Sequence, residues 1–161
     1  MGLRKYLRLA LLGGLISLLL TGCMLSYSVE ELYVLPKLPE EYQTLSEQIA
    51  AILAGGAEYA APTAGNNLQS VQLVDLDGDG EEEAVAFFRS NSEEKPLKIY
   101  IFRASDEAYQ QTSIIEGSGT SIQSIRYVDM DGDGVKEILV SWRVSAEVQA
   151  LELYSLRDLA A

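Results

Sequence analysis

The sequence predicts a mostly β domain that begins with one amphipathic helix and uses a β-rich unit twice. Apolar residues recur at helical spacing over residues 40–54, and short β-rich runs separated by Gly, Asp, Ser and Asn follow from Gly65. The β-rich part also aligns with itself at a constant offset. The chain has 161 residues, a length typical of one domain.

The N-terminus has the organisation of a secretory signal peptide. Three bases stand within the first eight residues, and an apolar run of 12 residues follows from Leu9 to Leu20. That run is short for a membrane-spanning helix but typical of a signal-peptide core. An uncleaved anchor helix with an incidental cysteine is the alternative interpretation.

The apolar run ends in Leu20-Thr21-Gly22-Cys23. This resembles the bacterial lipobox, whose cysteine is diacylated and becomes the new N-terminus when signal peptidase II cleaves. The resemblance implies that residues 1–22 are a lipoprotein signal peptide and that Cys23 is the lipidation site. It also implies that the protein is lipid-anchored on the extracytoplasmic face of a bacterial membrane.

The composition excludes several function classes. There are 24 acidic and 12 basic residues, a net charge of −12, so phosphate-backbone binding and a nucleic-acid partner are not expected. The absence of histidine excludes Ser-His and Cys-His nucleophiles and histidine-ligated metals, and a single cysteine excludes an internal disulfide. From Cys23 onward the chain has 9 bases and 24 acids. The acyl chains, rather than the acidic protein surface, are therefore expected to hold the protein at the membrane.

Residues 23–38 are predicted to be a tether, and residues 39–56 an amphipathic helix. Pro39 and two glutamates suit the first helical turn, and Gly55-Gly56 ends the run. The narrow apolar stripe favours packing on the protein's own domain over binding of a partner. The stripe consists of Tyr42, Leu45, Ile49, Ile52 and Leu53.

The β-rich part is an internal repeat. A shift of 54 residues aligns Gly65–Arg103 with Gly119–Arg157 without a gap, and 15 of 39 positions are identical. A constant offset over this length indicates one supersecondary unit used twice. Repeat 1 is expected over residues 65–118, and an incomplete repeat 2 over residues 119–161.

Each repeat is expected to contain antiparallel strands. Four are predicted in repeat 1, at residues 68–74, 84–89, 97–103 and 109–115, and three in repeat 2, at residues 122–128, 138–143 and 151–157. Such units suit propeller blades or a stacked antiparallel sheet. Because propellers close with about four to eight blades, two blade-like repeats predict an open sheet or an incomplete or shortened propeller.

An acidic loop follows the first strand of each repeat. Both loops, Asp75–Glu83 and Asp129–Glu137, have acids at positions 1, 3, 5 and 9 and glycines at positions 4 and 6. Alternate carboxylates, with the backbone carbonyl of Glu81 or Val135 at position 7, can supply the six to eight oxygens that Ca²⁺ takes. Oxygen ligands on a flexible loop favour Ca²⁺ over transition metals and Mg²⁺. A metal-free Asp-Gly turn is the alternative.

An EF-hand is excluded because position 12 is Ala86 or Val140 rather than glutamate. The loops instead resemble the FG-GAP and VCBS-type repeats of integrin-like β-propellers, where Asp-x-Asp-Gly-Asp-Gly-x-x-Asp/Glu lies between strands. The resemblance covers about residues 65–157 and implies two Ca²⁺ sites. The ligands that it implies are Asp75, Asp77, Asp79 and Glu83, and Asp129, Asp131, Asp133 and Glu137.

These features predict a lipoprotein whose Ca²⁺-stabilised repeats act as a binding or adhesion module for an extracellular protein or glycan. A non-catalytic role is expected, because histidine is absent and the ordered acids are predicted to be metal ligands. Two alternatives stay open. One is an accessory or catalytic domain of a polysaccharide-acting enzyme, and the other is a truncated propeller without independent activity.

Overall fold

The computed structural model describes residues 39–90, 94–105 and 108–159. The predicted signal peptide (residues 1–22), the predicted lipidation site Cys23 and the predicted tether (residues 23–38) lie outside these residues and stay predictions. Within the described part of the chain, no helix has both the length and the apolar character needed to cross a membrane.

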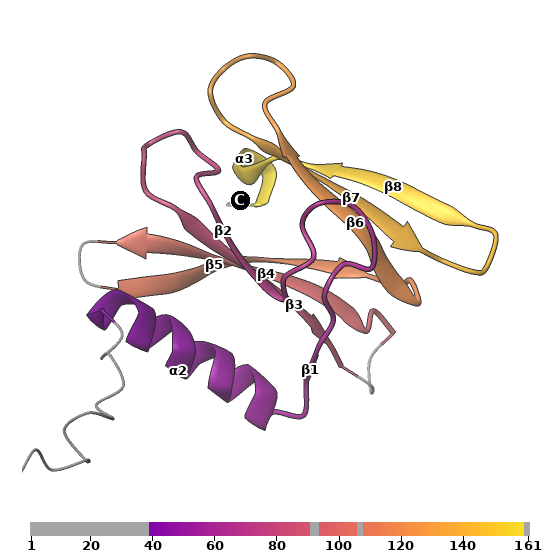
Figure 1. The fold of residues 1–161 in the computed structure, drawn as a ribbon, viewed down its shortest axis with the longest axis horizontal. Coiled ribbons are helices and arrows are strands. Elements are labelled where there is room, and N and C mark those ends of the chain that lie inside the picture. Colours follow the sequence, from indigo (N-terminus) through magenta and orange to yellow (C-terminus); the bar gives the residue numbers. More distant parts are fainter. Residues whose placement is uncertain (1–38, 91–93, 106–107, 160–161) are drawn as a thin grey trace, which may run out of the picture. The chain divides into compact units, whose positions relative to one another are not determined.

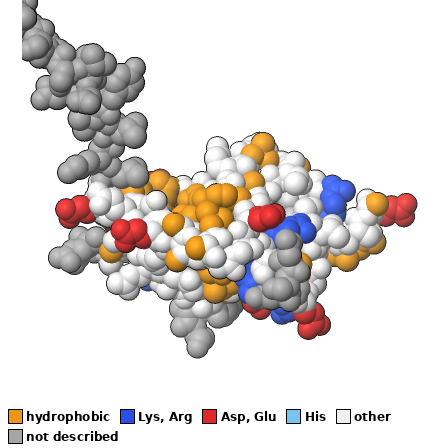
Figure 2. Space-filling model, turned by 90° about the horizontal axis from the view of Figure 1, so that it is seen from below, with side chains coloured by type: hydrophobic (Ala, Val, Ile, Leu, Met, Phe, Trp, Pro, Cys, Tyr) orange, Lys and Arg blue, Asp and Glu red, His pale blue; other side chains and the backbone are white. Residues whose placement is uncertain are grey.

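The predicted helix is confirmed as α2, Glu40–Ala54. It begins after Pro39, whose carbonyl oxygen accepts hydrogen bonds from the backbone N–H groups of Tyr42 (3.0 Å) and Gln43 (3.2 Å). It ends at Gly55, whose N–H donates to Ala51 O at 3.0 Å. The helix packs on its own domain, as its narrow apolar stripe predicts. The face of the molecule seen in Figure 2 carries a central group of hydrophobic side chains with acidic side chains near it.

The prediction of a mostly β fold is confirmed, with eight described strands in two antiparallel sheets that do not close into a ring. In the first sheet β1 and β2 both pair with β3, followed by β4 and β5. The second sheet has the order β6-β7-β8. The strands are β1 (Glu58–Tyr59), β2 (Val71–Val74), β3 (Glu83–Arg89), β4 (Leu97–Ser105), β5 (Ala108–Gly117), β6 (Ser121–Val128), β7 (Glu137–Arg143) and β8 (Gln149–Tyr154).

The first sheet lies between α2 on one face and the second sheet on the other (Figure 1). Alternation along β3 divides its side chains between these two neighbours. Ala84, Ala86 and Phe88 belong to the cluster that contains Leu45 and Ile49 of α2. The opposite face packs on the second sheet through Val85, Phe87, Leu97, Ile99, Ile101 and Ile115, which meet Ile122, Ile125, Ile138, Val140 and Trp142.

The two sheets stack with equivalent faces turned the same way, rather than with the same face of each sheet turned toward the other. Ile138, Val140 and Trp142 pack on the first sheet, and their repeat equivalents Ala84, Ala86 and Phe88 pack on α2. The same face of each repeat unit is therefore covered by the element that precedes it. The other face of the second sheet has no cover in the described part of the chain: Leu151 is 66% exposed and Leu153 50%.

Most observed strand ends differ from the predicted ones by at most two residues, and three differences are larger. β2 begins at Val71 rather than at residue 68. The last predicted strand ends at Tyr154, and a short helix, α3 (Leu156–Leu159), replaces its final residues. This helix contacts β5, where Ser113 Oγ donates to Leu159 O at 3.0 Å. The two-residue strand β1 carries too little pattern to be predicted.

One-directional stacking makes a matched pair of substitutions informative, because Ile99 and Leu153 occupy equivalent repeat positions. Ile99→Ala is expected to lower the free energy of unfolding by about 2–5 kcal/mol, since Ile99 is fully buried between the sheets. Leu153→Ala is expected to cost below about 1 kcal/mol, because half of its side chain already meets solvent. Urea denaturation followed by the fluorescence of Trp142 measures both. Equal losses would contradict the stacking.

Candidate metal centre

Both acidic loops form compact turns held by the same short-range hydrogen bonds. Asp75 Oδ1 accepts from the backbone N–H of Gly78 at 2.7 Å, and Asp129 Oδ1 accepts from that of Gly132, also at 2.7 Å. The position-4 glycines have φ values of 78° and 80° in the two loops, a backbone conformation that other residues rarely adopt. The sequence repeat is thus also a repeat of local structure.

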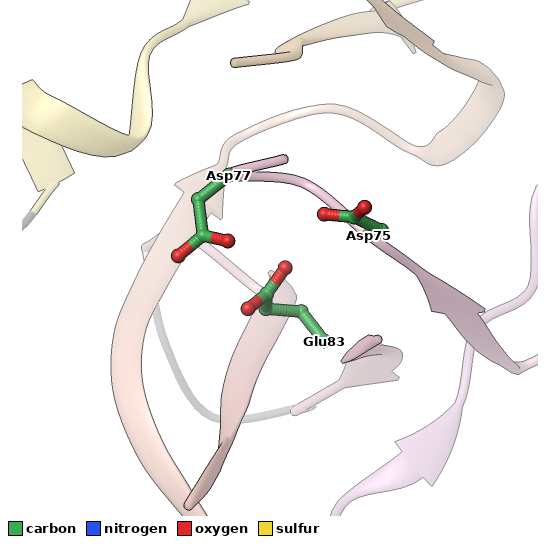
Figure 3. Close-up of side chains that lie close together, drawn as sticks. All are labelled: Asp75, Asp77 and Glu83. Carbon is green, nitrogen blue, oxygen red and sulfur yellow. The ribbon is translucent and has the colours of Figure 1, made fainter. Parts of the chain in front are cut away.

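The first loop brings three carboxylates together. One oxygen each of Asp75, Asp77 and Glu83 lies within 4.8 Å of the others, and the three side chains point toward one another (Figure 3). Asp75 and Asp77 come from the loop that follows β2, whereas Glu83 is the first residue of β3. Three oxygens converging from a coiled loop and an adjacent strand match the chemistry that a hard divalent cation requires.

Glu83 differs from the other two members of this cluster because it is buried. It is 1% exposed, and its Oε2 accepts a hydrogen bond from the backbone N–H of Leu76 at 2.7 Å. Its Oε1 is buried and has no hydrogen-bond partner among the described residues. Burial raises the pKa of Glu83 above its ordinary value, whereas the Leu76 hydrogen bond lowers it. A buried carboxylate oxygen without a partner is costly, and a bound cation would satisfy it.

The second loop forms a more exposed cluster. One oxygen each of Asp129, Asp131 and Asp133 lies within 4.8 Å of the others, and all three residues are exposed. Glu137 Oε2 accepts from Met130 N at 2.9 Å, as Glu83 does from Leu76, but Glu137 is only half-buried. The difference begins at position 2 of each loop, where Leu76 is fully buried and Met130 is 62% exposed.

The two loops contact each other. The backbone N–H of Lys136 donates to Leu76 O at 2.7 Å, and Lys136 Nζ donates to Asp75 O, also at 2.7 Å. A Cβ atom added to Gly78 would lie 2.6 Å from the carbonyl oxygen of Gly134. The second loop therefore supports the backbone of the first, next to its carboxylates.

Two arginines at equivalent repeat positions reach into the loops. Arg103 Nη2 lies 2.6 Å from Asp77 Oδ2, and Arg157 forms an ion pair with Asp133. The backbone N–H of Val135 lowers the pKa of Asp133, and the Arg157 charge adds to this effect. Neither these arginines nor Lys136 were predicted from the sequence to take part in the loops. The identity of Arg103 and Arg157 in the repeat alignment was the signal that could have identified them.

The structure thus brings together some of the predicted ligands. Asp79 does not join Asp75, Asp77 and Glu83 in the first cluster, and Glu137 does not join the second. The backbone N–H groups of the position-7 residues, Glu81 and Val135, donate to the preceding aspartates Asp79 (2.8 Å) and Asp133 (2.9 Å). Nothing in the described residues places their carbonyl oxygens at either cluster.

Comparison with known proteins gives one match. Residues 75–140 match the model of the FG-GAP-like repeat, a segment that begins at the first residue of the first acidic loop and includes the whole second loop. Searches of the curated proteins and of the solved structures gave no significant match. The match supports the repeat family that the loop pattern resembles.

The contact between the loops predicts unequal effects of two similar substitutions. Gly78→Ala and Gly80→Ala both place a Cβ on a backbone with positive φ, of 78° and 93°, which costs about 1–2 kcal/mol. Only the Gly78 variant also meets the neighbouring loop, because nothing lies within 4 Å of a Cβ at Gly80. Gly78→Ala is expected to lose about 1 kcal/mol or more beyond Gly80→Ala in chemical denaturation. Indistinguishable losses would rule out a close contact between the loops.

Proposed function

We propose that this protein is a lipid-anchored extracytoplasmic lipoprotein whose two blade-like β-repeats bind Ca²⁺ and act as a non-catalytic binding or adhesion module. The partner is an extracellular protein or glycan. The observation that carries the proposal is the buried Glu83, whose carboxylate lies with those of Asp75 and Asp77 and has one buried oxygen without a hydrogen bond. The FG-GAP-like match over both loops supports the same interpretation.

In this proposal Asp75, Asp77 and Glu83 hold the first ion, and Asp129, Asp131 and Asp133 hold the second. The ion supplies positive charge that offsets the mutual repulsion of the carboxylates. The first site is the tighter one, because its glutamate is buried and its loop is anchored by Leu76 in the core. The role of the ions is structural, since each loop connects the strands that form a repeat unit.

The composition and the clustered acids also support binding rather than catalysis. The chain contains no histidine, and the clustered acids are proposed ligands, so none is left as a general acid or base. A hollow beside the first loop is lined by residues of α2, the loop, β4 and β5, including Tyr42, Glu81 and Tyr109. An ion that fixes this loop would also fix one wall of that hollow.

Ca²⁺ is expected to stabilise the wild-type protein against unfolding. If the dissociation constant is about 10⁻⁴–10⁻³ M, as in extracellular modules, about 10 mM Ca²⁺ adds roughly 1–3 kcal/mol over EGTA. Glu83→Gln is expected to lose most of this gain but to be at least as stable as the wild type in EGTA, because an incompletely compensated buried charge is removed. Thermal unfolding followed by Trp142 fluorescence provides the measurement.

The matched control is Glu82→Gln, which removes an exposed acid beside the cluster and is expected to keep the Ca²⁺ response. Mg²⁺ at equal concentration is expected to raise the unfolding midpoint less, because Mg²⁺ requires near-octahedral geometry that a flexible acidic loop supplies poorly. A wild-type midpoint that is the same in EGTA and in Ca²⁺ would contradict the proposed metal sites.

The membrane anchor has a separate test. When the full-length chain is produced in a bacterium supplied with labelled palmitate, the label is expected to appear in the protein and in the membrane fraction. Cys23→Ser is expected to abolish both, because the chain contains no other cysteine. A Cys23→Ser protein that still incorporates label would show that Cys23 is not the lipidation site.

A further inference from the structure

We propose that Arg103 serves as a built-in cation of the first metal site, which a divalent ion must displace, so that Arg103 sets the affinity of this site. The inference rests on the proposed metal function and deepens it. It names a residue that lies outside both acidic loops and comes from β4.

The contacts of Arg103 place its guanidinium on two of the three clustered carboxylates. Nη2 lies 2.6 Å from Asp77 Oδ2, and Nε lies 3.7 Å from Glu83 Oε1. The second distance is within ion-pair range but too long for a hydrogen bond, so the Glu83 oxygen that lacks a hydrogen bond has only a loose ion pair with the guanidinium. Arg103 therefore compensates the cluster incompletely.

The arginine is positioned by the pairing of β3 with β4. Ala84 pairs with Phe102, so the backbone of Arg103 lies beside the start of β3, where Glu83 is buried. The Arg103 side chain is half-exposed at 50%, whereas that of Glu83 is 1% exposed. The half-exposed guanidinium can therefore move into solvent, whereas the buried Glu83 side chain cannot move away from the cluster.

This arrangement gives Arg103 opposite effects in two conditions. Without a metal ion, its charge offsets the repulsion between Asp77 and Glu83 and stabilises the fold. When a divalent cation binds the same oxygens, that charge repels the ion and must move away. The Arg103 side of both ion pairs is half-exposed, and its pair with Glu83 is long at 3.7 Å, so the exchange is possible at modest cost. Removal of Arg103 should thus weaken the metal-free protein and tighten ion binding.

The test uses the full-length protein in detergent, with CaCl₂ as the ligand, and compares wild type with Arg103→Gln. Calorimetric titration is expected to give a first-site dissociation constant about three- to tenfold lower for Arg103→Gln. Its melting temperature in EGTA is expected to be lower than that of the wild type. Arg103→Lys, which keeps the charge but loses the planar fork, is expected to fall between the two and remains informative if the glutamine variant folds poorly.

Two variants control for the loss of one positive charge. Lys95→Gln removes an exposed charge at the far end of β3 and β4, roughly 20 Å from the loop, where salt screens it. Arg157→Gln removes the equivalent arginine, which pairs with Asp133 of the second loop. Neither is expected to change the first-site dissociation constant by more than about twofold.

The outcomes separate this inference from the proposed function. Wild type that binds Ca²⁺ with the same affinity as Arg103→Gln, or controls that tighten binding equally, would overturn the role of Arg103 and leave the metal site intact. Binding by Arg103→Gln alone would support the role of Arg103 and overturn Ca²⁺ binding by the natural protein. Absence of binding in both proteins would overturn both proposals.

Discussion

The first sheet has two apolar faces, and the need to bury both determines how the described part of the chain is arranged. Alternating residues of β3 are fully buried on either side, with Ala86 on the face toward α2 and Phe87 on the face toward the second sheet. A sheet with two buried faces needs a layer on each side. The helix supplies one layer, and the second copy of the repeat supplies the other, so the second repeat is part of the core of the first.

The difference between the two acidic loops follows from this stacking. The first loop lies where the sheets meet, so Leu76 enters the core between them and draws the start of β3 inward. The second loop has the same hydrogen bonds but no further sheet beyond it in the described residues, and Met130 stays exposed. Loops that share six of nine residues therefore give one cluster with a buried carboxylate and one that is solvated.

The sequence could predict the secondary structure of each segment but not which other segments pack against it. Periodicity located α2 and the long strands, and the spacing of acids and glycines located both loops, because these patterns are local. Repeat alignment treats Glu83 and Glu137 as equivalent, and only the three-dimensional packing distinguishes them. Arg103 was missed for the same reason, since its contact with Asp77 depends on the pairing of β3 with β4. The predicted end of β8 was wrong because the residues after Tyr154 form α3, which packs on β5, a contact between segments distant in sequence.

Packing and the proposed ion binding at the first loop are linked through Leu76. Its side chain fills the core between the sheets, its N–H donates to Glu83, and its carbonyl oxygen accepts from Lys136 of the other loop. A cation that draws Glu83, Asp75 and Asp77 together would stabilise the same backbone that joins the two sheets. Conversely, any change that separates the sheets would release Leu76 and open the cluster. A change at Leu76 itself is therefore expected to weaken the inter-sheet packing and the metal affinity together, because this one residue contributes to both.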